Sequence, residues 1–197
     1  MKSLSLFVLA VTLVAAGPVL AQIDPTPDGV GIYFDNNGTI NCLPDVTPGE
    51  YGPGFMYLMV TNPAEPTGIS GWELQLVFDS CLLVTDWGYQ AGATNSGTEP
   101  DFYVTQPAPL PSAATVILLD MTFYVLCSDC ALMYISPPPV QHVPGFPAYS
   151  AGDDPNEWIT LHQSTGGSQF PVAAINCICD VISNDNATWG AMKTMYR

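Results

Sequence analysis

Prolines and glycines interrupt this chain so often that long helices have little room to form. The 197 residues contain 19 prolines and 17 glycines, and the runs between them are short. Almost none of these runs has the 3.6-residue period of an amphipathic helix, whereas several alternate with the period of two that is typical of half-buried strands. The sequence therefore predicts an all-β protein.

The clearest alternation lies in the segment ISGWELQLVFDSCLLV, residues 69–84. Its large apolar side chains fall on every second residue, so we expect one face of this strand to point into the core. These core-facing residues are Trp72, Leu74, Leu76 and Phe78. The predicted strands are 29–34, 55–62, 72–78, 82–86, 101–106, 115–126, 131–136, 157–163 and 170–179. Strands of this length and spacing favour an antiparallel two-sheet sandwich over a closed barrel.

The first residues have the composition of a secretory signal peptide. Lys2 precedes an apolar run at about 4–16, and Val19-Leu20-Ala21 forms a small-x-small cleavage site. The run is too short to span a bilayer, and Gln22 after the cut is not a cysteine that could carry lipid. We expect a secreted protein, extracellular or periplasmic, with no membrane insertion after cleavage. Its predicted parts are a signal peptide (1–21), a β-sandwich domain (22–180) and a tail (181–197).

The charge of the expected mature chain is strongly acidic. All 18 Asp and Glu residues follow Ala21, where the only basic residues are Lys193 and Arg197. Such a surface disfavours nucleic acid and anionic membranes as partners. Solubility in a salty or calcium-containing medium explains the acidity, and specific calcium binding is the alternative.

All six cysteines lie in the exported part, where an even number favours disulfides over a four-thiolate zinc site. Cys127-Ser128-Asp129-Cys130 has the spacing of a tight hairpin turn, which would place its two cysteines within disulfide distance. We therefore predict a Cys127–Cys130 disulfide. Cys42 and Cys81 would then pair with Cys177 and Cys179 in an order that the sequence leaves open.

The tail differs from the rest of the chain because it has a helical period. Trp189, Met192 and Tyr196 share one face at spacings of three and seven, and Lys193 and Arg197 lie near the helix end that favours cations. A helix this short is marginal alone, so we expect it to dock. Its target is either its own domain or a protein of an export or assembly machinery.

No catalytic motif stands out. His142 and His162 are the only histidines, and neither has a partner at a known motif spacing; Gly68-Ile69-Ser70-Gly71 is not a nucleophile elbow. Hydrolysis by paired carboxylates is open because no spacing tests it. The acidic segments 35–39 and 151–157 lack the EF-hand pattern, so we predict no metal or cofactor, with calcium as the open possibility.

Aromatic residues gather in and beside the predicted loops 87–100 and 137–156. Flat aromatic faces are typical of sugar-binding surfaces, although most such rings serve packing. The candidate ligand-binding residues are Trp87, Tyr89, Tyr103, Tyr149 and Trp158. The candidate contact residues of the tail are Trp189, Lys193, Tyr196 and Arg197.

Two segments carry a resemblance to a known family. TGISGWELQLVFDSCLLVTDWGYQAG at 67–92 resembles the strand, turn and strand of bacterial cohesin domains, and ATVILLDMTFYVL at 114–126 resembles a later strand of theirs. The resemblance implies the jelly-roll-like sandwich that cohesins share with carbohydrate-binding modules. It implies no dockerin-binding residue here, since the cysteines depart from cohesins.

A second resemblance spans nearly the whole mature chain. Small exported bacterial proteins without an assigned activity share GIYFD, a following Cys, YLxxTNP, ISGWE, PLP and a final WGxxKxxYR with it. The sequence therefore leads us to expect a non-catalytic, exported, cohesin-like module that binds a protein or polysaccharide. A structural subunit of an extracellular or envelope assembly is the alternative, and a secreted hydrolase is the third.

Overall fold

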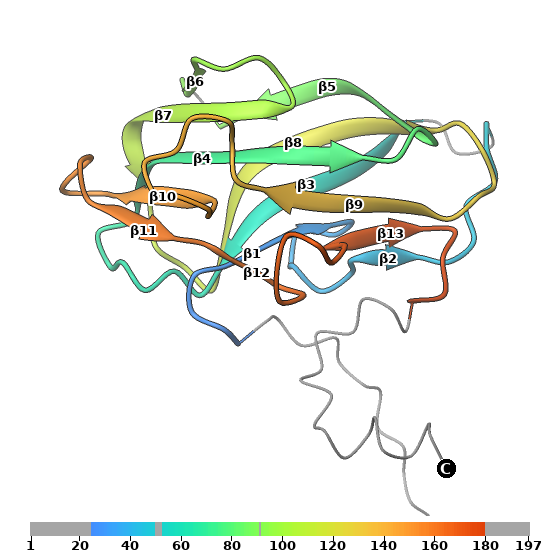
Figure 1. Ribbon diagram of the computed structural model, residues 1–197, viewed down its shortest axis with the longest axis horizontal. Helices are drawn as coiled ribbons and strands as arrows, with labels where there is room; N and C mark the ends of the chain where they lie inside the picture. The colour runs from blue at the N-terminus through green and yellow to red at the C-terminus, as the bar shows by residue number, and fades with distance from the viewer. Residues whose placement is uncertain (1–24, 50–52, 91, 180–197) are drawn as a thin grey trace, which may run out of the picture.

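The chain folds as two β-sheets packed face to face. The computed structural model describes residues 25–49, 53–90 and 92–179, and no helix occurs among them (Figure 1). The predicted all-β, two-sheet sandwich is confirmed. The predicted signal peptide (1–21) and the whole predicted tail (181–197), including the predicted helix around Trp189, lie outside the described residues.

The first sheet has five strands within the described part of the chain, in the order β12-β1-β3-β8-β5. Its central strand β3 pairs antiparallel with β1 and β8, and β12 joins β1 in parallel. Continuous apolar runs such as FMYLMV suit this central position, because both faces of β3 are largely covered. The strands are β1 (Gly29–Tyr33), β3 (Gly54–Thr61), β5 (Leu82–Tyr89), β8 (Thr115–Val125) and β12 (His162–Gln163).

The second sheet is built around β4 (Ile69–Phe78). On one side of β4 lie β10 and β9 in succession, and on the other side lies β7 with β6 beyond it. The order continues from β10 to β11 and from β9 through β13 to β2. The bounds are β2 (Cys42–Leu43), β6 (Thr94–Asn95), β7 (Asp101–Leu110), β9 (Ala131–Ser136), β10 (Ala148–Ala151), β11 (Trp158–Thr160) and β13 (Ala173–Ile175).

The core lies between the two sheets, as the alternation in β4 predicts. Trp72, Leu74 and Leu76 are fully buried, and Phe78 packs against the same cluster. Phe102 of β7 packs beside Trp72 with ring centroids 5.4 Å apart. One cluster that draws on both sheets therefore accounts for most of the buried apolar surface that stabilises the described fold.

Three predicted strands differ most from the observed ones. The predicted strand 157–163 is two strands, because buried Leu161 separates β11 in one sheet from β12 in the other. The predicted strand 170–179 is the shorter β13, and the predicted strand 101–106 extends through Pro107 and Pro109. A register shift between β4 and β7 leaves Pro107 and Pro109 without a paired residue on β4. Because no hydrogen bond of the β4–β7 ladder is formed there, the lack of an N–H group in proline does not weaken the pairing. The short strands β2, β6 and β10 had no sequence prediction.

Two of the loops at which the chain crosses between the sheets are linked to each other. Residues 79–81 lead from β4 to β5, and residues 126–130 lead from β8 to β9. The loops are held together by a hydrogen bond from Leu126 N to Cys81 O at 2.8 Å and by the disulfide Cys81–Cys127. Asp79 Oδ2 accepts a further bond from Leu132 N at 2.7 Å. These contacts fix the angle at which both chain segments change sheets.

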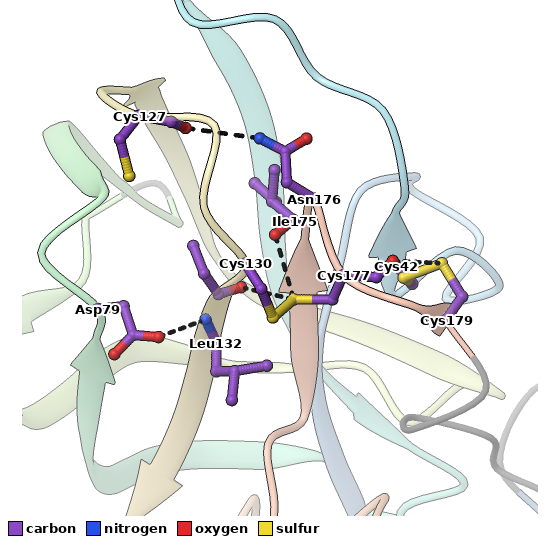
Figure 2. The surroundings of a disulfide bond; sticks show 10 residues. Cys42, Asp79, Cys127, Cys130, Leu132, Ile175, Asn176, Cys177 and Cys179 are labelled. Atoms are coloured by element: carbon purple, nitrogen blue, oxygen red, sulfur yellow. Dashed lines mark hydrogen bonds between the residues drawn. A yellow bond between two sulfur atoms is a disulfide. The ribbon is translucent and has the colours of Figure 1, made fainter.

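The predicted Cys127–Cys130 disulfide is wrong. The two cysteines do not close a hairpin, because β8 before them and β9 after them belong to different sheets. Cys127 instead bonds to Cys81, and Cys130 bonds to Cys177. Figure 2 shows Cys130 joined to Cys177 while Cys127 lies apart. The remaining disulfide, Cys42–Cys179, is one of the pairings that the sequence left open.

Among the described residues, no helix is long and apolar enough to cross a membrane.

Candidate functional site

An eleven-residue loop between β9 and β10 lies over the outer face of the second sheet (Figure 1). This loop, residues 137–147 with the sequence PPPVQHVPGFP, is called the strap below. Five of its residues are proline, which fixes φ and removes five backbone donors that would otherwise need partners. The strap therefore has few conformations to lose when it contacts a partner.

A buried carboxylate holds the middle of the strap. Trp72 faces the core, so the next residue of β4, Glu73, faces outward, and yet its side chain is completely buried because the strap covers it. Glu73 Oε1 accepts a hydrogen bond from His142 N at 2.7 Å. Glu73 Oε2 lies 2.6 Å from His142 Nδ1, which donates to it. Both carboxylate oxygens thus serve to position one residue of the strap.

Two aromatic residues of neighbouring strands complete the seat of the strap. The His142 ring stacks on Trp158 of β11 with centroids 4.0 Å apart and an interplanar angle of 7°. Tyr103 lies opposite Glu73 on β7, and its hydroxyl accepts a hydrogen bond from Val140 N at 2.8 Å. One residue from each of three strands therefore orients the strap: Glu73 of β4, Tyr103 of β7 and Trp158 of β11.

Apolar side chains on the strap point to solvent. Val140 is 72% exposed and Phe146 is 48% exposed, on either side of the anchored His142. Between them Gly145 has φ +85°, and a Cβ placed on it would meet no atom within 4 Å, so the turn there stands clear of the sheet. A rigid loop that presents large apolar groups can bind a complementary protein surface without first ordering itself.

The pair of His142 and Glu73 resembles part of a catalytic triad, but no serine or cysteine in the described part of the chain bonds to it. A base in such a triad accepts the proton of a serine or cysteine through its free ring nitrogen. Among the described residues, none forms a hydrogen bond to His142 Nε2. The contact that the structure shows is one that positions the strap.

The predicted ligand-binding aromatics separate into two groups. Trp158 and Tyr103 lie together beneath the strap. Trp87 and Tyr89 lie on β5 and pack against Phe102 with centroid distances of 5.4 and 6.4 Å. Both Trp87 and Tyr89 are half-buried, and one face of Trp158 is covered by His142, so these rings do not form a flat exposed platform.

The prediction that Tyr149 contacts a ligand is wrong, because Tyr149 is fully buried. It faces the core from β10, and its hydroxyl donates to Asp28 Oδ1 at 2.6 Å. Burial and, next, the hydrogen bond to the Asp28 carboxylate raise the pKa of the Tyr149 hydroxyl well above its usual value. Asp28 Oδ1 also accepts from Ala64 N at 2.7 Å, so this contact joins β10 to the start of β1 and to the loop after β3.

Replacing Tyr149 by phenylalanine should lower the free energy of unfolding by about 1.5–3 kcal/mol, because the buried Asp28 carboxylate loses a donor that water cannot replace. Urea unfolding followed by circular dichroism measures this loss. Tyr124→Phe is the matched control, since that ring lies on an exposed part of β8. Equal stability of both variants would show that the Tyr149–Asp28 bond contributes nothing.

The comparisons with known proteins bear on the sandwich that carries the strap. No protein-family model and no curated protein matches the sequence. A type II cohesin domain from the cellulosome of Acetivibrio cellulolyticus is similar in structure, with a TM-score of 0.51 and 15% identity over 80% of this chain and 98% of that chain. The fold is cohesin-like. The sixth cohesin of scaffoldin B from the same organism, solved with a dockerin, has a TM-score of 0.49 and 12% identity over 78% of this chain and 100% of that chain.

The cohesin-like fold confirms the β-sandwich that the sequence resemblance to cohesin domains implied. At 15% identity it establishes the arrangement of the sheets, so any binding surface has to be derived from this chain's own residues. The likeness to small exported bacterial proteins with GIYFD and WGxxKxxYR stays a prediction.

Neither of the two metal ions considered from the sequence, zinc and calcium, gains a site in the described part of the cohesin-like sandwich. Cys81, Cys127 and Asp129 lie close together, but the two sulfurs are bonded to each other and are not thiolate ligands. In the turn 35–39, burial alone would raise the pKa of Asp35, but hydrogen bonds from the Thr39 hydroxyl and from the N–H groups of Ile40 and Thr39 outweigh it and lower that pKa. Those donors account for the Asp35 carboxylate without an ion, and calcium binding stays an open possibility.

Sequence reasoning did not identify Glu73 and His142 as partners. They are 69 residues apart, on a strand and a loop that meet only when β10 returns beside β4. The available signal was indirect: a single glutamate on the outward side of an alternating strand, and a proline-rich loop with one histidine. The predicted functional loop 137–156 does include the strap.

Proposed function

We propose that this protein is a non-catalytic, exported module that binds another protein through the strap. The observation that carries the proposal is the exposure of Val140 and Phe146 on a loop whose backbone is fixed by the buried Glu73 carboxylate. Natural proteins rarely bury a carboxylate unless it is hydrogen-bonded, and here both bonds go to the strap. The anchoring of an exposed apolar loop is better suited to recognition than to catalysis.

The similarity to a cohesin domain of a cellulosome supports a binding role. Export is supported by the predicted signal peptide and by three disulfides, which persist in oxidising compartments. We place the protein outside the cell or in the periplasm on these grounds.

The charge of the molecule limits what kind of protein can bind. Within the described residues there is no Lys or Arg, whereas all but four of the 18 carboxylates belong to them; the four are Asp24, Glu50, Asp180 and Asp185. An acidic partner would meet like charges around the strap, which costs affinity and slows association. The partner therefore has an apolar patch with a basic or uncharged rim.

A capture experiment tests the proposal. The immobilised protein should retain a specific exported protein of the source cells, and Val140→Asp/Phe146→Asp should reduce that retention at least tenfold, because it places two charges in an apolar contact. Leu83→Asp is the matched control, since Leu83 is 49% exposed on the other sheet. A partner retained equally by both variants would remove the strap from the proposal, and retention of a polysaccharide instead of a protein would replace it.

A further inference from the structure

A second feature, far along the chain from the strap, is an apolar pocket at the end of the sandwich where β3 begins and β8 ends. It has a volume of about 420 Å³ and is lined mainly by Phe34, Leu43, Val46, Phe55, Tyr57 and Phe123. Phe55 at its rim is 60% exposed, which is unusual for a ring of this size on a soluble domain. Pockets of a few hundred Å³ can enclose an aromatic side chain or a small organic molecule. We call this feature the end pocket.

The C-terminal segment starts at the wall of the end pocket. Cys42 precedes the lining residue Leu43 and is bonded to Cys179, with Cα atoms 5.7 Å apart (Figure 2). Asn176 holds the other lining residue of this wall by bonds of 2.6 Å from Val46 N to its Oδ1 and 2.9 Å from its Nδ2 to Val46 O. The chain therefore leaves the described fold within about 10 Å of the pocket wall.

The segment beyond Cys179 has the composition to occupy such a pocket. Its aromatic and apolar residues Trp189, Met192 and Tyr196 recur at helical spacing, and a helix this short needs a surface to dock on. Trp189 is ten residues from Cys179, which allows a reach of up to about 33 Å. That reach exceeds the distance from Cys179 to the pocket several times.

The charges of the two parts are complementary. Lys193 and Arg197 are the only basic residues after Ala21. Two acidic residues are chain neighbours of lining residues: Asp35 follows Phe34, and Asp45 precedes Val46. The Asp35 and Asp45 carboxylates can attract the two cations once the rings are seated.

We propose that residues 180–197 fold back onto their own molecule and place Trp189 in the end pocket. The disulfide Cys42–Cys179 makes this an intramolecular contact at high effective concentration, because it fixes the root of the segment beside Leu43. The occupant of the pocket is thus the chain's own C-terminal segment, and we expect the cations of that segment near Asp35 and Asp45.

Trypsin tests the proposal because the chain 22–197 has one tryptic bond, after Lys193. In the oxidised protein this bond should be cut about tenfold more slowly than in a synthetic peptide of residues 180–197, a factor that corresponds to about 1.4 kcal/mol of docking free energy. Phe55→Ala and Trp189→Ala should each restore the rate of the peptide. Val140→Ala, an exposed apolar residue on the strap, is the matched control and should leave the protection unchanged.

Three results would overturn the proposal. The first is cleavage of the unaltered protein at the rate of the free peptide. The second is protection that persists in Phe55→Ala while circular dichroism shows an intact fold. The third is protection that grows with protein concentration together with a dimer in light scattering, which would assign the pocket to the segment of a second copy. A failure of the strap to bind a partner changes none of these measurements.

Discussion

The double variant Cys130→Ser/Cys177→Ser should unfold with a free energy about 4 kcal/mol lower than that of the unaltered protein. The disulfide closes a loop of 47 residues, and the chain-entropy model assigns a loop of that length about this stabilisation. For a domain of this size the loss corresponds to a melting temperature roughly 10 °C lower. The local effect should be largest at β13, a strand of only three residues that Cys130–Cys177 ties to the start of β9.

Cys81→Ser/Cys127→Ser is the matched control for that experiment. It opens a loop of 46 residues, so loop entropy alone predicts the same loss. Urea unfolding of both variants under oxidising conditions measures the difference, and neither variant leaves an unpaired thiol to rearrange. A loss below about 1 kcal/mol for Cys130→Ser/Cys177→Ser would show that the short strands beside Cys177 persist without their covalent link.

Replacing Glu73 by leucine should release the strap and lower the free energy of unfolding by about 3 kcal/mol. His142 N and Nδ1 both lose a carboxylate acceptor, and hydrogen bonds to charged groups contribute about 1.5–3 kcal/mol each. Leucine fills a similar volume, so the loss reports the hydrogen bonds and not a cavity. Amide hydrogen exchange should rise at Val140 and His142 while β4 stays protected.

Two variants separate this anchor from a general effect of charge. Glu157→Leu removes an exposed carboxylate from the loop before β11 and should leave strap exchange unchanged. Glu73→Gln keeps an oxygen for His142 N and should retain most of the protection. If Glu73→Leu and Glu157→Leu exchange alike across residues 137–147, the strap is held by its prolines and not by Glu73.

Strand positions could be predicted from the sequence because they are local properties. The alternation from Trp72 to Phe78 and the apolar run in β8 each determine which face is buried without reference to any distant residue. Pairing depends on sheet membership, which no local pattern encodes. The spacing of Cys127 and Cys130 fits a hairpin, but β8 and β9 enter different sheets, so the spacing led to the wrong disulfide.

The candidate site was harder to predict for the same reason. β10 consists of four buried residues between Pro147 and Gly152, too few for an alternation to be recognised. Without β10 there is no return of the chain to β4, and hence no reason to pair His142 with Glu73. Aromatic residues in the predicted loops suggested a sugar-binding surface. Tyr149 is instead buried in the core, because β10 pairs with β4 and places Tyr149 opposite Trp72, and this pairing cannot be predicted from the local sequence.

The disulfide Cys42–Cys179 also determines how the molecule would carry mechanical tension. A pull between Gly29 and the segment after Cys179 passes along the chain to Cys42 and then directly through one sulfur–sulfur bond. Residues 43–178, which hold every described strand except β1 and the first residue of β2, lie outside this load path. Under such a pull the described fold lengthens by the peeling of β1 from β3 and β12, while the remaining strands stay unloaded.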